Sequence, residues 1–262
     1  MKSGFRMFDT HTHLGVACHS ARSCTPDELL RNMDRHGVDR SLAIPFPVVD
    51  DYRSQHDLIG HAVRANPDRL LGAACLFPLI DRSVFQDEVR RCREQYGFRA
   101  LKLQPQYHAL NPLSGSSDFF FEAALENHMA VVCHTGSGLP LASPALLMMP
   151  ARKFPDLTIV VAHAGGGIYV HEAILAAHFC PNIVLELSTL MPHHVLEVLS
   201  YIDSGRLMIG SDLRMATSGF FAVRGRLYIK YEQDVNRLPQ NRAVPSELWS
   251  NAGLRSADTR LY

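Results

Sequence analysis

Eight apolar, β-branched runs alternate with helix-like stretches along the chain, and this alternation is the feature that most constrains its fold. The runs recur about every 30 residues, which is the spacing of successive strand–helix units. They cover Arg6–His13, Arg40–Pro45, Leu70–Phe77, Arg99–Leu103, Ala130–His134, Thr158–His163, Ile183–Leu187 and Leu207–Ser211. Several of them, such as 157–162, are apolar on both faces, which is typical of a buried parallel sheet.

The stretches between these runs carry the start and stop signals of helices. Thr25 offers an N-cap, Pro26 suits the first turn, and Gly37 is placed to end that helix. Three further stretches, 83–96, 117–128 and 192–202, are amphipathic in the same way. The sequence therefore predicts one α/β domain over residues 1–262, a (β/α)8 TIM barrel with a helical tail. A doubly wound open sheet is the structural alternative, although no glycine-rich dinucleotide fingerprint follows the first run.

Composition excludes several classes of partner and location. The 26 basic and 26 acidic side chains balance, which argues against a nucleic-acid surface. No apolar run approaches the roughly 18 to 20 residues that span a membrane, and six cysteines without CxxC spacing indicate reduced thiols. We therefore expect a cytoplasmic protein that acts on a small molecule. Helices on the outside of a barrel often support dimers, so a homodimer is compatible with this pattern.

Metal-ligand residues stand at the ends of several of the predicted strands. His11 and His13 are two residues apart, so both imidazoles face the same side of a strand. His134, His163 and Asp212 end later runs in the same relative place. The carboxyl ends of all barrel strands open on one face, which could gather all five side chains. Three imidazoles and a carboxylate suit zinc, with one position left for water.

These residues and their order resemble the amidohydrolase superfamily over nearly the whole chain, from His11 to about Asn251. The segment 98–105 is similar to the amidohydrolase-related branch, which includes lactonases and decarboxylases like aminocarboxymuconate-semialdehyde decarboxylase. The resemblance implies one divalent metal per chain, most readily zinc, with two metals as the alternative. It implies as metal ligands His11, His13, His134 and Asp212. Asp212 would also take a proton from metal-bound water, and His163 would contact the substrate oxygen or a second metal.

Lys102 has two readings. In binuclear relatives the corresponding lysine is carboxylated and bridges two metals, whereas in the related branch it is an unmodified lysine of the pocket. The segment Lys102-Leu103-Gln104-Pro105 is similar to the second pattern. We therefore expect a free ammonium that binds a substrate carboxylate or carbonyl oxygen.

The leading functional hypothesis is a metal-dependent hydrolase of a small amide, ester or lactone, with Asp212 as general base. The alternative is a metal-dependent, non-oxidative decarboxylase on the same scaffold, which would release carbon dioxide without net addition of water. A phosphoesterase is less favoured, because TatD-like nucleases carry a glutamate where Lys102 stands. A barrel that only binds a partner, with a vestigial site, is the non-enzymatic alternative.

The remaining candidates are weaker. Gly165–Gly167 could receive an anionic group or could form a tight turn, and Arg214 could contact a substrate carboxylate. Cys133 should point away from the site into the core, because it neighbours His134 on a strand. His108 and His193–His194 are not expected to be ligands. Surface or cap positions are expected for the histidines of the helix-like stretches, His36, His56, His61, His128, His171 and His178.

Overall fold

The computed structural model describes residues 6–18, 22–47, 51–213, 218–223 and 226–231. A sheet of nine strands forms its centre, in the order β2-β1-β3-β4-β5-β6-β7-β8-β9. The strands are β1 (Phe8–Val16), β2 (Ser23–Cys24), β3 (Arg40–Pro45), β4 (Leu70–Ala74), β5 (Ala100–Leu103), β6 (Ala130–His134), β7 (Ile159–Ala162), β8 (Ile183–Glu186) and β9 (Leu207–Met208). Each of the eight predicted runs overlaps one of the parallel strands, although β1 continues beyond the first run to Val16, and this confirms the α/β alternation. The short β2, antiparallel to β1, was not predicted.

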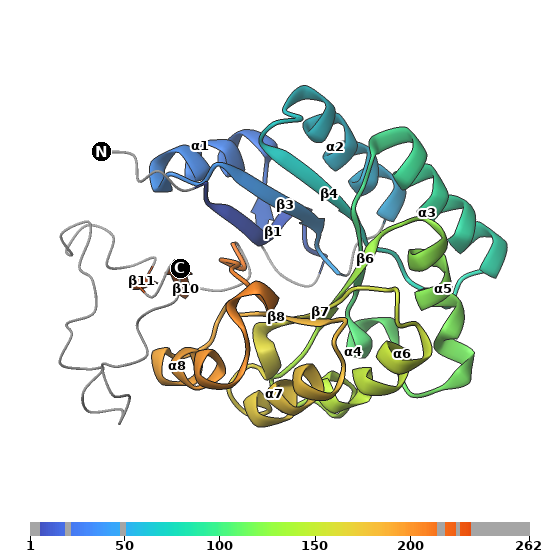
Figure 1. Cartoon of the computed structure of the whole chain (residues 1–262). Helices are drawn as coiled ribbons and strands as arrows, with labels where there is room; N and C mark the ends of the chain where they lie inside the picture. Colours follow the sequence, from blue (N-terminus) through green and yellow to red (C-terminus); the bar gives the residue numbers. More distant parts are fainter. Residues whose placement is uncertain (1–5, 19–21, 48–50, 214–217, 224–225, 232–262) are drawn as a thin grey trace.

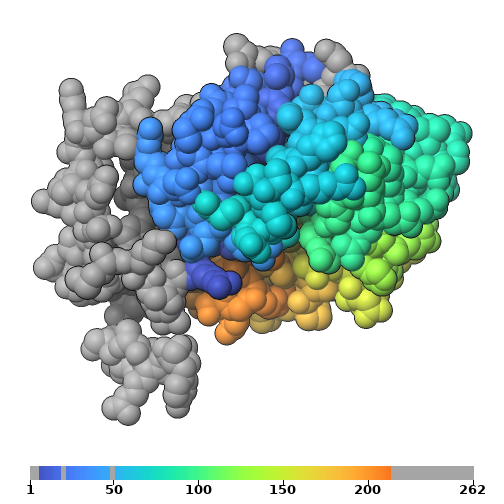
Figure 2. All heavy atoms as spheres, turned by 90° about the horizontal axis from the view of Figure 1, so that it is seen from above, coloured from blue at the N-terminus to red at the C-terminus, as the bar shows by residue number. Residues whose placement is uncertain are grey.

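The sheet is curled, so that its two ends approach each other. The backbone N–H of Thr10 in β1 donates to the carbonyl of Ile209 at 2.9 Å, and that of His13 to Leu213 at 3.3 Å. Thr12 and Leu213 form an isolated parallel bridge. Seen from above in Figure 2, blue N-terminal atoms accordingly adjoin orange atoms from the last part of the described chain. The site residues at the two ends of the sequence are thereby brought together.

Helices cover the outer face of the curled sheet (Figure 1). They are α1 (Pro26–His36), α2 (Tyr52–Ala65), α3 (Arg82–Tyr96), α4 (Pro105–His108), α5 (Asp118–Glu126), α6 (Met148–Lys153), α7 (Val170–Phe179) and α8 (Pro192–Tyr201). The predicted caps of α1 are present, since Thr25 and Glu28 form a capping box and Gly37 adopts φ 68°. Among the helices that the structure describes, none is both long and apolar enough to cross a membrane.

Strand alternation divides the core into an outer and an inner layer. Outward-facing residues such as Leu101, Val131 and Cys133 pack in the large cluster of buried side chains that includes the helices. The prediction that Cys133 is a core residue is therefore confirmed. A smaller inner cluster holds alternate residues of the strands, Leu42, Ile44, Ala73, Ala100, Val132, Val160 and Ala162. Lys102 and His134 follow Ala100 and Val132 by two residues, so they continue this inner face toward the carboxyl ends of the strands.

The end of the chain is only partly described. Two further strands, β10 (Ser218–Val223) and β11 (Arg226–Tyr231), form an antiparallel pair that was not predicted from the sequence. The predicted helical tail beyond them lies outside the described residues, as does Arg214.

Candidate metal centre

The inner face of the sheet changes from apolar to polar at the carboxyl ends of its strands. His11 and His13 lie on β1, Lys102 on β5 and His134 at the end of β6, while His163 follows β7 and Asp212 follows β9. All are buried except His134, which is half-buried. The structure therefore brings all the predicted site residues to one end of the curled sheet.

Three of these side chains form a compact group of potential metal donors. One donor atom from each of His11, His13 and Asp212 lies within 4.8 Å of the others. Asp212 Oδ1 is 3.3 Å from His13 Nε2 and 3.7 Å from His11 Nε2. Two imidazole nitrogens and a carboxylate oxygen are a donor set suited to a divalent transition metal.

The Nδ1 nitrogens of His11 and His13 also have hydrogen-bonding partners. His11 Nδ1 lies 2.9 Å from Glu186 Oε2, and His13 Nδ1 lies 3.2 Å from the carbonyl oxygen of Pro45. The His13 ring also stacks on Phe46, with 5.2 Å between ring centroids. Contacts of this kind orient histidine ligands in metal sites. The residues present therefore fit a metal bound through both Nε2 atoms and Asp212.

Lys102 lies directly beside this group. Its side chain is almost completely buried, and Nζ lies 3.0 Å from His11 Nε2. Burial lowers the pKa of Lys102, and the carboxylates of Asp212 and Glu186 oppose that effect. A buried amine at this position can serve an anionic substrate group.

His134 and His163 lie together next to the compact group. Their rings are nearly perpendicular with centroids 4.8 Å apart, and the His163 ring also stacks on His11 at 4.9 Å. His163 Nδ1 contacts Ser188 Oγ at 2.7 Å. Among the described residues, His134 belongs to none of the tight donor groups, so its role as a ligand stays a prediction.

Burial and neighbouring charges set the protonation of the site. Burial alone would raise the pKa of Asp212, but the hydrogen bond with His13 and the charges of His11 and His163 outweigh it and lower the pKa to about 2. Burial lowers the pKa of His134 to about 3, with help from Lys102 and His13. The carboxylate is therefore ionised and this imidazole neutral at neutral pH, as metal binding requires.

Two buried carboxylates of the site, Glu186 and Asp9, were not predicted from the sequence. Glu186 lies behind His11, and Asp9 accepts hydrogen bonds from the backbone N–H of His11 at 3.2 Å and of Ser211 at 2.9 Å. Burial raises the pKa of Asp9 to about 6, against the effect of those hydrogen bonds. The only sequence signal for each was an acidic residue inside an otherwise apolar strand. Glu186 lies in the run 183–187, and Asp9 lies beside the His-x-His pair.

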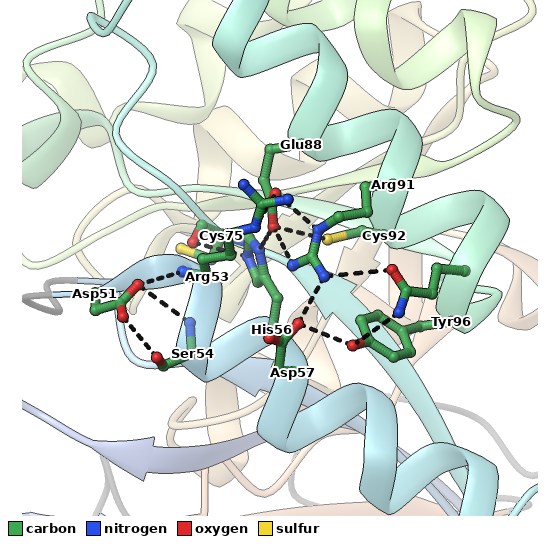
Figure 3. Close-up of polar contacts among 11 residues, drawn as sticks. Asp51, Arg53, Ser54, His56, Asp57, Cys75, Glu88, Arg91, Cys92 and Tyr96 are labelled. Atoms are coloured by element: carbon green, nitrogen blue, oxygen red, sulfur yellow. Dashed lines mark hydrogen bonds and ion pairs between the residues drawn. The ribbon is translucent and has the colours of Figure 1, made fainter.

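A second group of potential donors lies away from this centre, between α2 and α3. His56, Glu88 and Cys92 approach one another there, but both Glu88 oxygens are engaged, by His56 at 2.8 Å and by Arg91 at 2.6 and 2.9 Å. Figure 3 shows Arg91 reaching between Glu88 and Asp57. A guanidinium paired with Glu88 opposes metal binding, so this is a structural ion-pair network. The expectation that His56 is a surface or cap residue is wrong, because it is completely buried.

Two weaker candidates have structural roles. His108 is buried, and its Nδ1 accepts from the backbone N–H of Gln104 at 3.3 Å while Nε2 contacts the Pro47 carbonyl. It thus joins the loop after β3 to the end of β5. The 165–167 glycines all have positive φ, and a Cβ on Gly165 would lie 2.9 Å from the backbone nitrogen of Val170, which favours the tight turn over an anion site.

Comparison with known families gives one match, to the amidohydrolase family over residues 8–225. No curated protein matches the chain significantly in sequence.

Several solved structures share the fold at low sequence identity. A 5-carboxyvanillate decarboxylase from Novosphingobium aromaticivorans, in complex with manganese, aligns with a TM-score of 0.64 and 14% identity over 80% of this chain and 86% of that one. An uncharacterised TIM-barrel protein from Bordetella bronchiseptica gives 0.64 and 15% over 81% and 87%. A probable 2-pyrone-4,6-dicarboxylic acid hydrolase from Acinetobacter baumannii, with citric acid bound, gives 0.56 and 17% over 79% and 84%.

Proposed function

Since the chain belongs to the amidohydrolase family, we propose that it is a metal-dependent decarboxylase of a small, carboxylate-bearing molecule. The observation that carries this proposal is the position of Lys102, whose buried amine lies 3.0 Å from the nitrogen that His11 would offer to a metal. The ammonium of Lys102 and a metal ion bound by His11 would place two positive charges side by side in a buried site. Such a pair suits a carboxylate. The decarboxylase of similar fold, whose name indicates a carboxylated aromatic substrate, supports the same assignment.

We propose one divalent ion per chain, held by His11, His13 and Asp212, with His134 as a further ligand. Zinc suits the histidine-rich donor set. Manganese is the second candidate, because the decarboxylase of similar fold contains it. Once the lone pair of His11 Nε2 is used for a metal, Lys102 Nζ is free to bind the substrate, which favours one metal and an unmodified lysine.

The residues around the centre then have separate tasks. A bound divalent ion would supply a positive charge next to the substrate and would lower the pKa of coordinated water. Lys102 holds the substrate carboxylate, and the ring of Phe46 supports the His13 ligand. We assign to His163, whose ring lies beside His11 and His134, the exchange of a proton with the carbon from which carbon dioxide departs. Asp212, ionised at neutral pH, can take up a proton from solvent at Oδ1 or Oδ2 and return it, so that one solvent proton replaces the departing carbon dioxide on that carbon.

Hydrolysis of a carboxylated lactone is the second candidate function. Asp212 favours it, because an ionised carboxylate within 4.8 Å of both ligand nitrogens is placed to act as general base toward water. The hydrolase of similar fold, named for a dicarboxylated pyrone, agrees with this alternative.

Isotope incorporation separates the two reactions. The zinc- or manganese-loaded chain would be incubated in deuterated, 18O-enriched water with a panel of aromatic carboxylates and carboxylated lactones. Decarboxylation should release carbon dioxide and leave one deuterium on the product carbon. Hydrolysis should place 18O in the product without carbon dioxide. Turnover of lactones alone would overturn the decarboxylase proposal, and no turnover of either class by the loaded chain would overturn both.

We also infer that the chain forms a single eightfold barrel domain, with residues 1–262 assigned to it. The hydrogen bonds of Thr10 and His13 to 209–213 support closure between the first and last parallel strands. The TIM-barrel protein of similar fold supports it as well.

A further inference from the structure

Glu186 and Ser188 form a completely buried pair behind the donor group, at the end of β8. Neither residue has a task in the chemistry proposed above. Glu186 nevertheless contacts four hydrogen-bonding groups, which come from the side chain of His11, the backbone of His163 and both the backbone and the side chain of Ser188. One carboxylate thus links a metal ligand to the histidine that we assign to proton exchange.

The backbone contacts define Glu186 as an acceptor. The N–H of Ser188 donates to Oε1 at 2.6 Å, and the N–H of His163 donates to Oε2 at 3.2 Å. A backbone N–H can only donate, so each oxygen already receives one hydrogen. With Glu186 in its carboxylate form, which can only accept, His11 Nδ1, 2.9 Å from Oε2, carries a hydrogen and donates it. In a neutral ring this leaves a lone pair on His11 Nε2, which is the nitrogen that faces Asp212 and Lys102.

Ser188 connects Glu186 to His163 and so also determines which nitrogen of His163 carries the hydrogen. Its hydroxyl has a single hydrogen, and two neighbours compete for it, Glu186 Oε2 at 2.8 Å and His163 Nδ1 at 2.7 Å. The carboxylate is the stronger acceptor, because a hydrogen bond to a charged oxygen is about twice as strong as a neutral one. The hydroxyl therefore donates to Glu186, and its oxygen accepts from His163 Nδ1–H. A neutral His163 then also has its lone pair on Nε2.

We propose that Glu186 is a positioning residue that sets the tautomers of two histidines, that of His11 directly and that of His163 through Ser188. Both rings then carry Nδ1–H and keep Nε2 unprotonated. For His11 this prepares a metal ligand. For His163 it means that, in the chemistry proposed above, the neutral ring offers an acceptor and not a donor at Nε2. This last consequence rests on the proposed function, whereas the tautomers do not.

Nitrogen-15 NMR of the histidine side chains reads the tautomers without substrate. Spectra of the full chain would be recorded first without metal and then with zinc, which is diamagnetic. Wild type should show the Nδ1–H form for both His11 and His163. Ser188→Ala should change the His163 signals and leave those of His11 unchanged, and Ser188→Thr, which keeps the hydroxyl, should restore them. Ser117→Ala removes a buried hydroxyl elsewhere and serves as the matched control.

Metal affinity separates the two residues further. An amide cannot replace Glu186, because its NH2 group would face a donor at either oxygen position. Glu186→Gln should therefore change both rings and lower zinc affinity about 10- to 100-fold, while Ser188→Ala should change affinity less than about twofold.

The outcomes distinguish this inference from the proposed function. An Nε2–H tautomer of His163 in wild type, or an unchanged His163 spectrum in Ser188→Ala, would overturn it. The tautomer result holds as a test even for a chain that binds no zinc and catalyses neither reaction, so a failure of the proposed function is recognised separately.

Discussion

At the scale of single residues, two side chains of the site stand on backbone that has an unfavourable conformation. His163 and Asp212 have φ values of 67° and 50°, in the left-handed region that favours glycine. Such conformations cost on the order of 1 kcal/mol or more for each residue. Buried carboxylates hold both segments, since Glu186 accepts from the His163 N–H and Asp9 from the N–H and hydroxyl of Ser211. Tertiary contacts therefore position these two side chains against local preference.

Replacing Lys102 tests its role as the substrate cation. Lys102→Met keeps the apolar stem and removes the amine, so kcat/KM should fall about 10- to 150-fold through the loss of a hydrogen bond to a charged group. Steady-state kinetics and metal analysis by mass spectrometry would be run together. Metal content should match wild type. Loss of metal in Lys102→Met would instead indicate a carboxylated, bridging lysine and contradict the free-ammonium assignment.

Replacing one ligand tests the metal centre itself. His13→Ala removes one of the two convergent nitrogens, so metal bound after dialysis should fall from about one ion per chain to well below that. His61→Ala, at an exposed position of α2, is the matched control and should retain the ion. Equal metal content in the two variants would refute the assignment of His13.

At the scale of elements, a charged network joins α2 to α3 and to the end of β4. His56 Nδ1 donates to Glu88, and His56 Nε2 accepts from the backbone N–H of Cys75 at 2.9 Å. Arg91 bridges Glu88 to Asp57, which also accepts from the Tyr96 hydroxyl. Figure 3 shows these side chains meeting between the two helices. The network fixes two helices relative to the strand they cover.

Glu88→Gln should therefore destabilise the protein. The amide leaves Arg91 with a poorer partner in a largely buried setting, and such losses cost about 3 kcal/mol. Asp87→Asn removes an exposed i,i+3 partner of Arg90 on the same helix and should change the free energy of unfolding by less than about 0.5 kcal/mol. Urea denaturation of both variants would compare them. Equal values would show that the network contributes no more than a surface ion pair.

At the scale of the whole molecule, the same network makes stability depend on pH. Burial would raise the pKa of Glu88, but His56 and Arg91 outweigh it and lower the pKa from 4.5 to about 2. A carboxyl with a lowered folded pKa stabilises the protein above its unfolded pKa and loses that contribution as pH falls.

The difference in unfolding free energy between wild type and Glu88→Gln should thus have its maximum value above about pH 4.5. It should decrease by about 2 to 3 kcal/mol as pH falls toward 2. Urea denaturation of both proteins at several pH values in this window would measure the difference. A difference that stays constant down to pH 2 would contradict the lowered pKa.

Much of the fold could be predicted from the sequence, because it depends on local periodicity. The parallel strands lie inside the predicted runs except for β1, which continues past His13 to Val16, and the Thr25 cap and Gly37 end bound α1 as expected. Strand alternation also correctly predicted that His11 and His13 share a face and that Cys133 takes the opposite one. The β10–β11 pair and β2 were not anticipated, since they depend on the partner with which a short segment pairs.

The partners of the site residues were decided only by the tertiary structure. Glu186 reaches His11 across 175 positions of sequence, and Asp9 reaches Ser211 across 202. His56 could not be recognised as buried, because its burial depends on α3 covering it. The sequence by itself determined which side chains face inward and at which strand end they stand. The curl of the sheet decided which of them meet, because the distance between two strand ends is a property of the whole curled sheet and not of any one strand.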